Sequence, residues 1–326
     1  MSKQQIIKQR LLSIILFIIS TSFCIASAEF FLRIKNSNMN NYDVEMWKYS
    51  KKLKKRDKNT ILDFDHIKNK KAILQKVEIR LNNRGFRGAN TEITNDKERR
   101  ILFLGSSITL GWGVKENQTT TSQLKKMLEK NGEYVDVING GIGNYNLYRS
   151  VNRFLLKHTD LETTDIVVHY FIRDAEDLNN TKDNFLLKNS QLALTLWIAK
   201  NRIFQKSGIN SLENHYELIY GNNSSGLVKM KESLKKLSVY AKSKKIRLYL
   251  AMIPDIQSLE DYKFDEIHDL MKTFAEEYNY KFIDTLPNLV GLSQKEIYSM
   301  PGDPHPNALG HRLMAEKIFE NIKLKK

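Results

Sequence analysis

Asp303 and His305 lie two positions apart near the C-terminus and are the residues best suited to acid–base chemistry. Proline follows each of them, and a residue that precedes proline is disfavoured in helical geometry. In an extended segment the side chains at i and i+2 point the same way, so the carboxylate can orient the imidazole. This is half of a catalytic triad. The alternative is a turn in which Asp303 and Asn307 cap the last helix.

A nucleophile for this base is available in Ser106 or Ser107, which follow Gly105 and the apolar run 101–104. A strand that ends in such a turn presents a hydroxyl at its carboxyl edge, where ligands bind in open α/β sheets. Taken alone, serines at this place more often cap a helix or satisfy a turn.

Two further strand ends carry groups that could stabilise negative charge. The loop 139–144 is rich in glycine, and a free backbone N–H at Gly141 would be an oxyanion donor. Arg173 and Asp174 follow the apolar run 165–171. Parallel strands bring these loops to one edge of the sheet, together with the serines.

The elements that must hold these loops alternate between short apolar strands and helices. This alternation predicts one α/β domain over residues 97–326, with a doubly wound, flavodoxin-like, five-stranded parallel sheet between two helical layers. The expected strands are 100–104, 134–138, 165–171, 246–253 and 280–284. The expected helices are 121–130, 147–157, 192–204, 228–241, 264–278 and 308–322. Residues 34–96 are polar and basic and predict a juxtamembrane stalk and lead-in, with some helix at 72–76.

Composition excludes several classes of function. The single cysteine, Cys24, permits neither a disulfide framework nor a cysteine-based metal site. Paired histidines at metal-ligand spacing are absent from the sequence, so we expect no metal and no cofactor. The net charge of +15 is scattered outside 51–58 and accompanies no nucleic-acid fingerprint, so we expect no nucleic-acid partner. His169 and His311 are expected in the sheet and on the last helix, and the histidines in charged stretches are expected to be exposed: His66, His158, His215 and His268.

The N-terminus has the features of a targeting element. Lys3, Lys8 and Arg10 precede an uncharged run, 11–28, that just reaches membrane-spanning length. We expect residues 1–33 to be an uncleaved anchor that contacts the membrane through 11–32, with the rest of the chain exported. Cleavage after the small residues 26–28 is the alternative.

Four sequence blocks, in order, resemble the SGNH or GDSL-type serine hydrolases, and in particular their membrane-anchored bacterial members. The blocks are 105–109, 139–146, 165–174 and 303–307, and the similarity extends over roughly 82–326. The resemblance implies that Ser107 is the nucleophile, His305 the general base and Asp303 its orienting carboxylate. It also implies an oxyanion hole from the backbone N–H groups of Ser107 and Gly141.

This chain departs from the family pattern at three places. Ser106 replaces the usual aspartate, which is not a triad member. The last block reads Asp-x-His rather than Asp-x-x-His, as in alginate acetyltransferase-like relatives. Arg173 stands where the family has the asparagine that completes the oxyanion hole. Arg173 could donate N–H groups to the anion, or it could pair with Asp174 or Glu176.

Three functions follow from these features. We expect a membrane-anchored serine esterase that removes acyl groups, chiefly acetyl, from an envelope glycan or a lipid-linked substrate. The alternatives are an O-acyltransferase that works beside a membrane acyltransferase partner in polysaccharide acetylation, and a non-catalytic envelope protein on an SGNH scaffold. The sequence does not distinguish hydrolysis from transfer, because both use the same triad.

Overall fold

The computed structural model describes residues 3–37, 41–91, 99–180, 184–205, 212–221 and 224–324. The chain forms two compact units. Met1–Trp47 and Lys182–Ile209 make up the first, which we call the helical unit. Lys48–Thr181 and Asn210–Lys326 make up the second, which we call the sheet unit.

The sheet unit is built on five parallel strands in the order β6-β5-β7-β8-β9, as expected from the sequence. The chain enters the sheet at β5, adds β6 on one side and then crosses to β7 on the other side. The carboxyl ends of β5 and β7 therefore flank the point where the strand order reverses, which is where doubly wound sheets bind ligands. The strands are β5 Arg99–Gly105, β6 Val135–Asn139, β7 Asp165–Phe171, β8 Arg247–Ile253 and β9 Lys281–Asp284.

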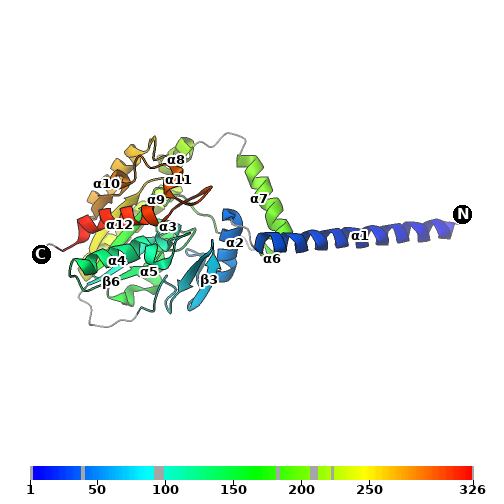
Figure 1. Ribbon diagram of the computed structural model, residues 1–326, viewed down its shortest axis with the longest axis horizontal. Coiled ribbons are helices and arrows are strands. Elements are labelled where there is room, and N and C mark those ends of the chain that lie inside the picture. The colour runs from blue at the N-terminus through cyan, green and yellow to red at the C-terminus, as the bar shows by residue number, and fades with distance from the viewer. Residues whose placement is uncertain are drawn as a thin grey trace. The chain divides into compact units, whose positions relative to one another are not determined.

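Helices cover both faces of this sheet because successive strand residues point to opposite sides. Ile101 and Phe103 of β5 pack in a core with α4 (Thr120–Lys130) and α12 (Ala308–Ile322). Leu102 and Leu104 pack in a second core with helices of the opposite layer. Figure 1 shows α4 and α12 side by side on one face. The opposite layer contains α5 Leu147–Lys157, α8 Leu212–Tyr220, α9 Ser225–Lys244 and α10 Asp265–Glu277.

The lead-in before the sheet is folded. The helix expected at 72–76 is wrong: β3 (Lys70–Leu74) and β4 (Val77–Leu81) form an antiparallel hairpin there. Gln75 and Lys76 make the turn with φ values of 48° and 64°, a conformation for which the usual signals are Asn and Gly. The other lead-in elements are α2 Tyr42–Leu53, β1 Lys54–Arg56 and β2 Phe64–His66. Of the predicted domain boundaries, the one at 96/97 lies outside the described residues.

The helical unit contains a 35-residue helix, α1 (Lys3–Ser37), together with α6 (Phe185–Asn189) and α7 (Gln191–Gln205). An 18-residue window of α1 has a mean hydropathy of 2.3, and none of it is buried. By length and composition α1 is able to cross a membrane, and a signal sequence would have the same properties.

A buried carboxylate joins three central strands of the sheet at their amino ends. Asp165 of β7 is fully buried and accepts two hydrogen bonds from Arg99 of β5, both at 3.1 Å. It also accepts hydrogen bonds from Arg247 of β8 at 2.8 Å and from Thr164 at 2.7 Å. Burial alone would raise the pKa of Asp165, but these donors outweigh it and lower the pKa below its ordinary value.

We predict that Asp165→Ala lowers the free energy of unfolding by about 3 kcal/mol, because buried Arg99 loses one of its two carboxylate partners and keeps only Glu133 at 2.6 Å. Since the folded-state pKa of Asp165 is depressed, its contribution is present above the unfolded pKa of about 4 and is lost as the pH falls. Urea unfolding of the full-length protein at pH 7, and again at about pH 2.5, below the unfolded pKa, measures both effects.

The matched control is Asp160→Ala. Asp160 pairs with Arg84 at 2.7 Å, but its side chain is 58% exposed, so we expect a loss below about 1 kcal/mol. Equal losses for the two variants would show that burial does not determine how much the Asp165 cluster contributes to the free energy of unfolding.

Candidate active site

Ser107 lies at the first turn after β5, at the start of the short helix α3 (Ser107–Leu110). Gly105 permits this turn, because a Cβ there would lie 2.1 Å from Thr109 Oγ1 and 2.7 Å from the His169 carbonyl oxygen. Gly111 ends the helix in the left-handed region at φ 80°. The strand, the tight turn and the one-turn helix fix the Ser107 side chain at the carboxyl edge of the sheet.

Three side chains form a hydrogen-bonded chain at this edge. Ser107 Oγ lies 2.8 Å from His305 Nε2, and His305 Nδ1 lies 2.5 Å from Asp303 Oδ1. Asp303 is fully buried, and His305 is 6% exposed. In this arrangement the carboxylate holds the Nδ1–H tautomer, and Nε2 is the nitrogen able to accept the serine proton.

A short antiparallel hairpin presents Asp303 and His305. Its strands are β10 (Tyr298–Met300) and β11 (Asp303–Pro306). The extended geometry of β11 places the two side chains on the same side, as the i, i+2 argument expects. Asn307 caps α12, accepting hydrogen bonds from Leu309 N at 2.9 Å and Gly310 N at 3.2 Å. The capping alternative therefore applies to Asn307, whereas the Asp303 carboxylate faces His305.

Asp303 has two further donors that the sequence analysis did not identify. Gln75 Nε2, from the turn of the β3–β4 hairpin, donates to Asp303 Oδ2. Trp112 Nε1 donates to the same oxygen at 3.2 Å. Gln75 is 228 positions away from Asp303 in the chain, so no local pattern reports this contact.

The glycine loop is held by its own backbone N–H groups. The Gly141 N–H donates to Asn139 Oδ1 at 3.1 Å, and the Gly143 N–H donates to Tyr49 Oη at 2.9 Å. Asn144 is in the left-handed region at φ 61°. Within residues 140–144, all described, its N–H is the one without an acceptor in the structure. The Gly141 N–H is thus available to another acceptor only if its bond to Asn139 is given up or shared.

Arg173 and Asp174 follow β7 at the same edge. The Arg173 side chain is 39% exposed, and its Nη2 lies 3.5 Å from Glu176 Oε2. Of the two partners considered from the sequence, Glu176 is the one that forms this ion pair. Asp174 is buried, and burial raises its pKa to about 8 although the Phe171 N–H donates to it at 3.2 Å. Asp174 is therefore mostly uncharged at neutral pH.

Several other histidines are structural. His169 is fully buried beside Thr109 Oγ1 at 3.0 Å, and burial lowers its pKa to about 3. The exposure expected for His66, His158 and His268 is wrong, because they are 2%, 4% and 4% exposed. Within the described ranges, no group of three or more His, Cys, Asp or Glu side chains is placed to hold a metal ion.

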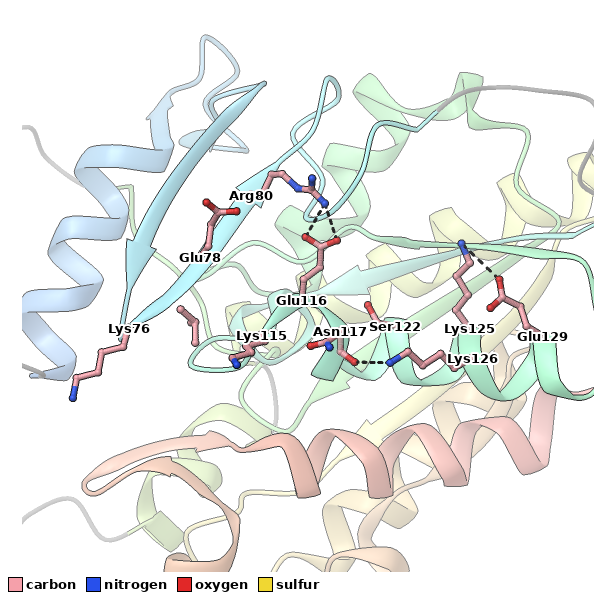
Figure 2. Close-up of a pocket in the computed structure, with 11 residues that line it drawn as sticks. Lys76, Glu78, Arg80, Lys115, Glu116, Asn117, Ser122, Lys125, Lys126 and Glu129 are labelled. Carbon is pink, nitrogen blue, oxygen red and sulfur yellow. Dashed lines mark hydrogen bonds and ion pairs between the residues drawn. The ribbon is translucent and has the colours of Figure 1, made fainter.

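A charged groove of about 690 Å³ lies between the β3–β4 hairpin and α4 (Figure 2). Arg80 and Glu116 face each other across it at 3.1 Å. Lys76, at one end, directly follows Gln75, the donor to Asp303. Its lining residues are Lys76, Val77, Glu78, Arg80, Lys115, Glu116, Asn117, Ser122, Lys125, Lys126 and Glu129.

We predict that Asp174→Asn makes the protein more stable relative to wild type as the pH rises. The folded-state pKa is raised, so the wild type loses stability between about pH 4 and pH 8, whereas the amide does not titrate. The difference in free energy of unfolding between Asp174→Asn and wild type should grow by about 2–3 kcal/mol from pH 5 to pH 7. Urea unfolding measures it, with the half-exposed Glu176→Gln as control. A gap that is independent of pH would mean that Asp174 is ionised in the folded protein.

Solved structures that resemble this chain share low sequence identity with it, and two of those described below are named as acetyl xylan esterases. An acetyl xylan esterase, AlAXEase, shares 15% identity over 68% of this chain and 99% of its own, with a TM-score of 0.44. A variant of Axe2, an acetylxylan esterase from Geobacillus stearothermophilus, shares 16% identity over 70% and 96%, with a TM-score of 0.45. TesA shares 15% identity over 69% and 98%, also with a TM-score of 0.45.

The search of curated proteins returned no match. The profile of the GDSL-like lipase/acylhydrolase family matches residues 103–313, which include Ser107, the glycine loop, Arg173 and the Asp303–His305 pair. This match spans most of the chain, from the middle of β5 into α12. The chain is therefore an ester-hydrolysing enzyme and belongs to the GDSL-like lipase/acylhydrolase family.

Proposed function

We propose that this protein is a membrane-anchored serine esterase that removes O-acyl groups, chiefly acetyl, from an envelope glycan or a lipid-linked saccharide. The observation that carries the proposal is the continuous chain from Ser107 Oγ through His305 to Asp303, with distances of 2.8 Å and 2.5 Å. A non-catalytic scaffold would not need a buried carboxylate, an imidazole and a hydroxyl in this order.

In the first half of the reaction, Ser107 Oγ attacks the ester carbonyl carbon while His305 Nε2 takes the serine proton. Asp303 stabilises the imidazolium that forms and remains ionised itself. Collapse of the tetrahedral intermediate breaks the bond to the alcohol oxygen, which leaves with the proton from His305. In the second half, water attacks the acyl-serine carbonyl while His305 takes a water proton. Collapse then breaks the bond to Ser107 Oγ, which regains the proton from His305 as the carboxylic acid leaves.

The oxyanion of each intermediate needs donors that are already in place. The Ser107 N–H at the start of α3 is one. From the glycine loop we propose the Gly141 N–H inferred from the family resemblance, and it must give up or share its bond to Asn139 to act. Arg173 is the third candidate, and it must leave Glu176 to act.

The charged groove supports a hydrated rather than an aliphatic substrate. Its walls carry Lys76, Lys115, Lys125 and Lys126, and it begins one residue from the glutamine that contacts the triad carboxylate. Small-molecule pockets for apolar ligands are lined mostly by hydrophobic side chains. A saccharide chain with its hydroxyl and anionic groups fits such a surface.

Retention of α1 as an anchor is supported by a side chain just beyond the possible cleavage motif. Glu29 directly follows Ala28, and its carboxylate accepts hydrogen bonds from the N-terminus of α7. This geometry depends on Glu29 being held in a continuous helix. We therefore propose that α1 stays attached and that the sheet unit lies on the exported side.

Labelling with a fluorophosphonate probe and turnover of p-nitrophenyl acetate by the full-length protein test the esterase proposal. We expect Ser107→Ala to abolish both, because Ser107 Oγ is the hydroxyl that is hydrogen-bonded to His305 Nε2. We expect Arg173→Asn to leave labelling intact or to raise it, because an amide is a fixed donor. Labelling of Ser107→Ala at the wild-type rate would refute the triad.

A second prediction concerns Gln75. Gln75→Leu removes one donor to the buried Asp303 carboxylate, and such a hydrogen bond is worth roughly 1.5–3 kcal/mol. With Trp112 still donating, we expect kcat to fall by about tenfold and KM to change little.

Gln75→Glu tests whether Gln75 orients the Asp303 carboxylate or only packs the β3–β4 hairpin. A protonated carboxyl at this position can donate to Asp303, whereas an ionised one repels it, so activity should survive only toward acid pH. The pH profile of kcat for wild type and both variants measures this effect. An unshifted profile for Gln75→Glu would mean that Gln75 serves only to pack the hairpin.

A further inference from the structure

The α6–α7 segment is an insertion in the α/β alternation that the catalytic site does not use. It follows β7 and precedes α8, yet it belongs to the helical unit with α1. An expected strand–helix alternation does not require two helices here, and no residue of the proposed triad or oxyanion hole lies on them. The segment therefore calls for a separate explanation.

Polar contacts fix the start of α7 on α1. The Glu29 carboxylate accepts hydrogen bonds from Ser190 Oγ at 2.8 Å, Gln191 N at 3.0 Å and Leu192 N at 2.9 Å. It thereby satisfies backbone donors that a helix N-terminus leaves open, and its charge favours that end of the helix dipole. Arg33 Nη2 also donates to the Asn189 carbonyl at 2.8 Å.

A further contact lies one turn beyond on α1. Asn36 Nδ2 donates to Gln191 Oε1 at 2.6 Å, and this pair is buried. All of these contacts come from α1 residues that follow the uncharged run 11–28. The α6–α7 junction is thus attached at the point where the apolar part of α1 ends.

Large apolar side chains on α6 and α7 have no cover within the described residues. Phe185 and Leu186 of α6 are 76% and 64% exposed. Leu196 and Trp197 of α7 are 62% and 47% exposed. Four such residues within thirteen positions exceed the scattered exposure that is normal for a soluble surface.

The position of this apolar surface relative to α1 identifies what covers it. The run 11–28 is about 27 Å long at 1.5 Å per residue, close to the thickness of a bilayer core. If α1 spans, Glu29 and the start of α7 lie at the headgroup level. Figure 1 shows α7 leaving α1 at a steep angle rather than running beside it. If α1 spans the bilayer, α7 therefore lies along the membrane surface.

We infer that α6 and α7 form an interfacial hairpin that rests in the headgroup region of a lipid bilayer. Tryptophan prefers this depth, and the exposed Lys188 can reach lipid phosphates while its stem stays in the apolar layer. The inference rests on the proposed anchor. A bilayer accounts for both exposed apolar surfaces of the helical unit, whereas a protein partner would have to follow two helices in different directions.

Depth measurements on the full-length protein in phosphatidylcholine–phosphatidylglycerol vesicles test the inference. The only cysteine is Cys24, so single-cysteine variants carry an NBD label in a Cys24→Ser background. Leu196→Cys reports on α7, Ser20→Cys on the middle of the span, and Val239→Cys on an exposed apolar position, 65% exposed, of α9 in the sheet unit. Nitroxides near the headgroup or deep in the acyl chain quench the label, and aqueous dithionite bleaches it.

We expect the shallow nitroxide to quench the Leu196→Cys label at least twofold more than the deep one does, with the reverse order for Ser20→Cys. The Val239→Cys label should respond to dithionite alone. As a second readout without labelling, brominated lipid should quench wild-type tryptophan fluorescence more strongly than that of Trp197→Phe. Trp112, which is 1% exposed, should contribute little to this difference.

Each other outcome overturns the inference. If the Leu196→Cys label responds to dithionite and to no lipid quencher while Ser20→Cys remains lipid-quenched, the hairpin is off the membrane and the anchor stands. If neither dithionite nor either nitroxide lipid affects the Leu196→Cys label, a protein partner or second copy covers the face. If Ser20→Cys is not lipid-quenched, the proposed anchor fails together with the hairpin, while Ser107 labelling still tests the esterase.

Discussion

The buried carboxylate of Asp303 is the constraint on which the catalytic edge depends. A carboxylate with no exposed surface is costly unless each oxygen is hydrogen-bonded, and here Oδ1 meets His305 while Oδ2 receives Gln75 and Trp112. These donors come from three regions: the β3–β4 hairpin, the turn after α3, and β11. Satisfying one charge therefore fixes the relative positions of segments that are far apart in the chain.

The residues before the family domain are consequently part of the site's support. The family match begins at 103, yet Gln75 reaches Asp303 of the proposed triad from 28 residues earlier in the sequence. The glycine loop is held in a similar way: the Gly143 N–H donates to Tyr49 Oη, and Lys54 Nζ donates to the Gly143 carbonyl at 2.8 Å. The lead-in thus holds both Asp303, the proposed carboxylate of the triad, and the loop that is proposed to hold the oxyanion.

The parts of this arrangement that the sequence predicted are those with a local cause. The strand 165–171 is recognisable because a continuous apolar run suits a strand buried on both faces, and the Asp303–His305 pairing follows from two prolines and extended geometry. The β3–β4 hairpin was missed because Gln75 and Lys76 adopt positive φ without Gly or Asn, so the turn has no compositional signal. Gln75's role depends on a contact between distant segments, which one sequence does not encode in any local pattern.

Arg173 is the position where the physical balance differs most from the family pattern. Its pair with Glu176 is more than one-third exposed on both sides, so breaking it costs at most about 1 kcal/mol. Fixing an arginine side chain costs roughly 2 kcal/mol of rotamer entropy, whereas an oxyanion donor is worth roughly 3–4 kcal/mol. If Arg173 replaces the family's asparagine as the oxyanion donor, the net stabilisation of the transition state is therefore small for a neutral ester. That stabilisation increases if the substrate carries a negative charge near the ester, because the guanidinium then binds the substrate before reaction and its rotamer entropy is already lost when the oxyanion forms.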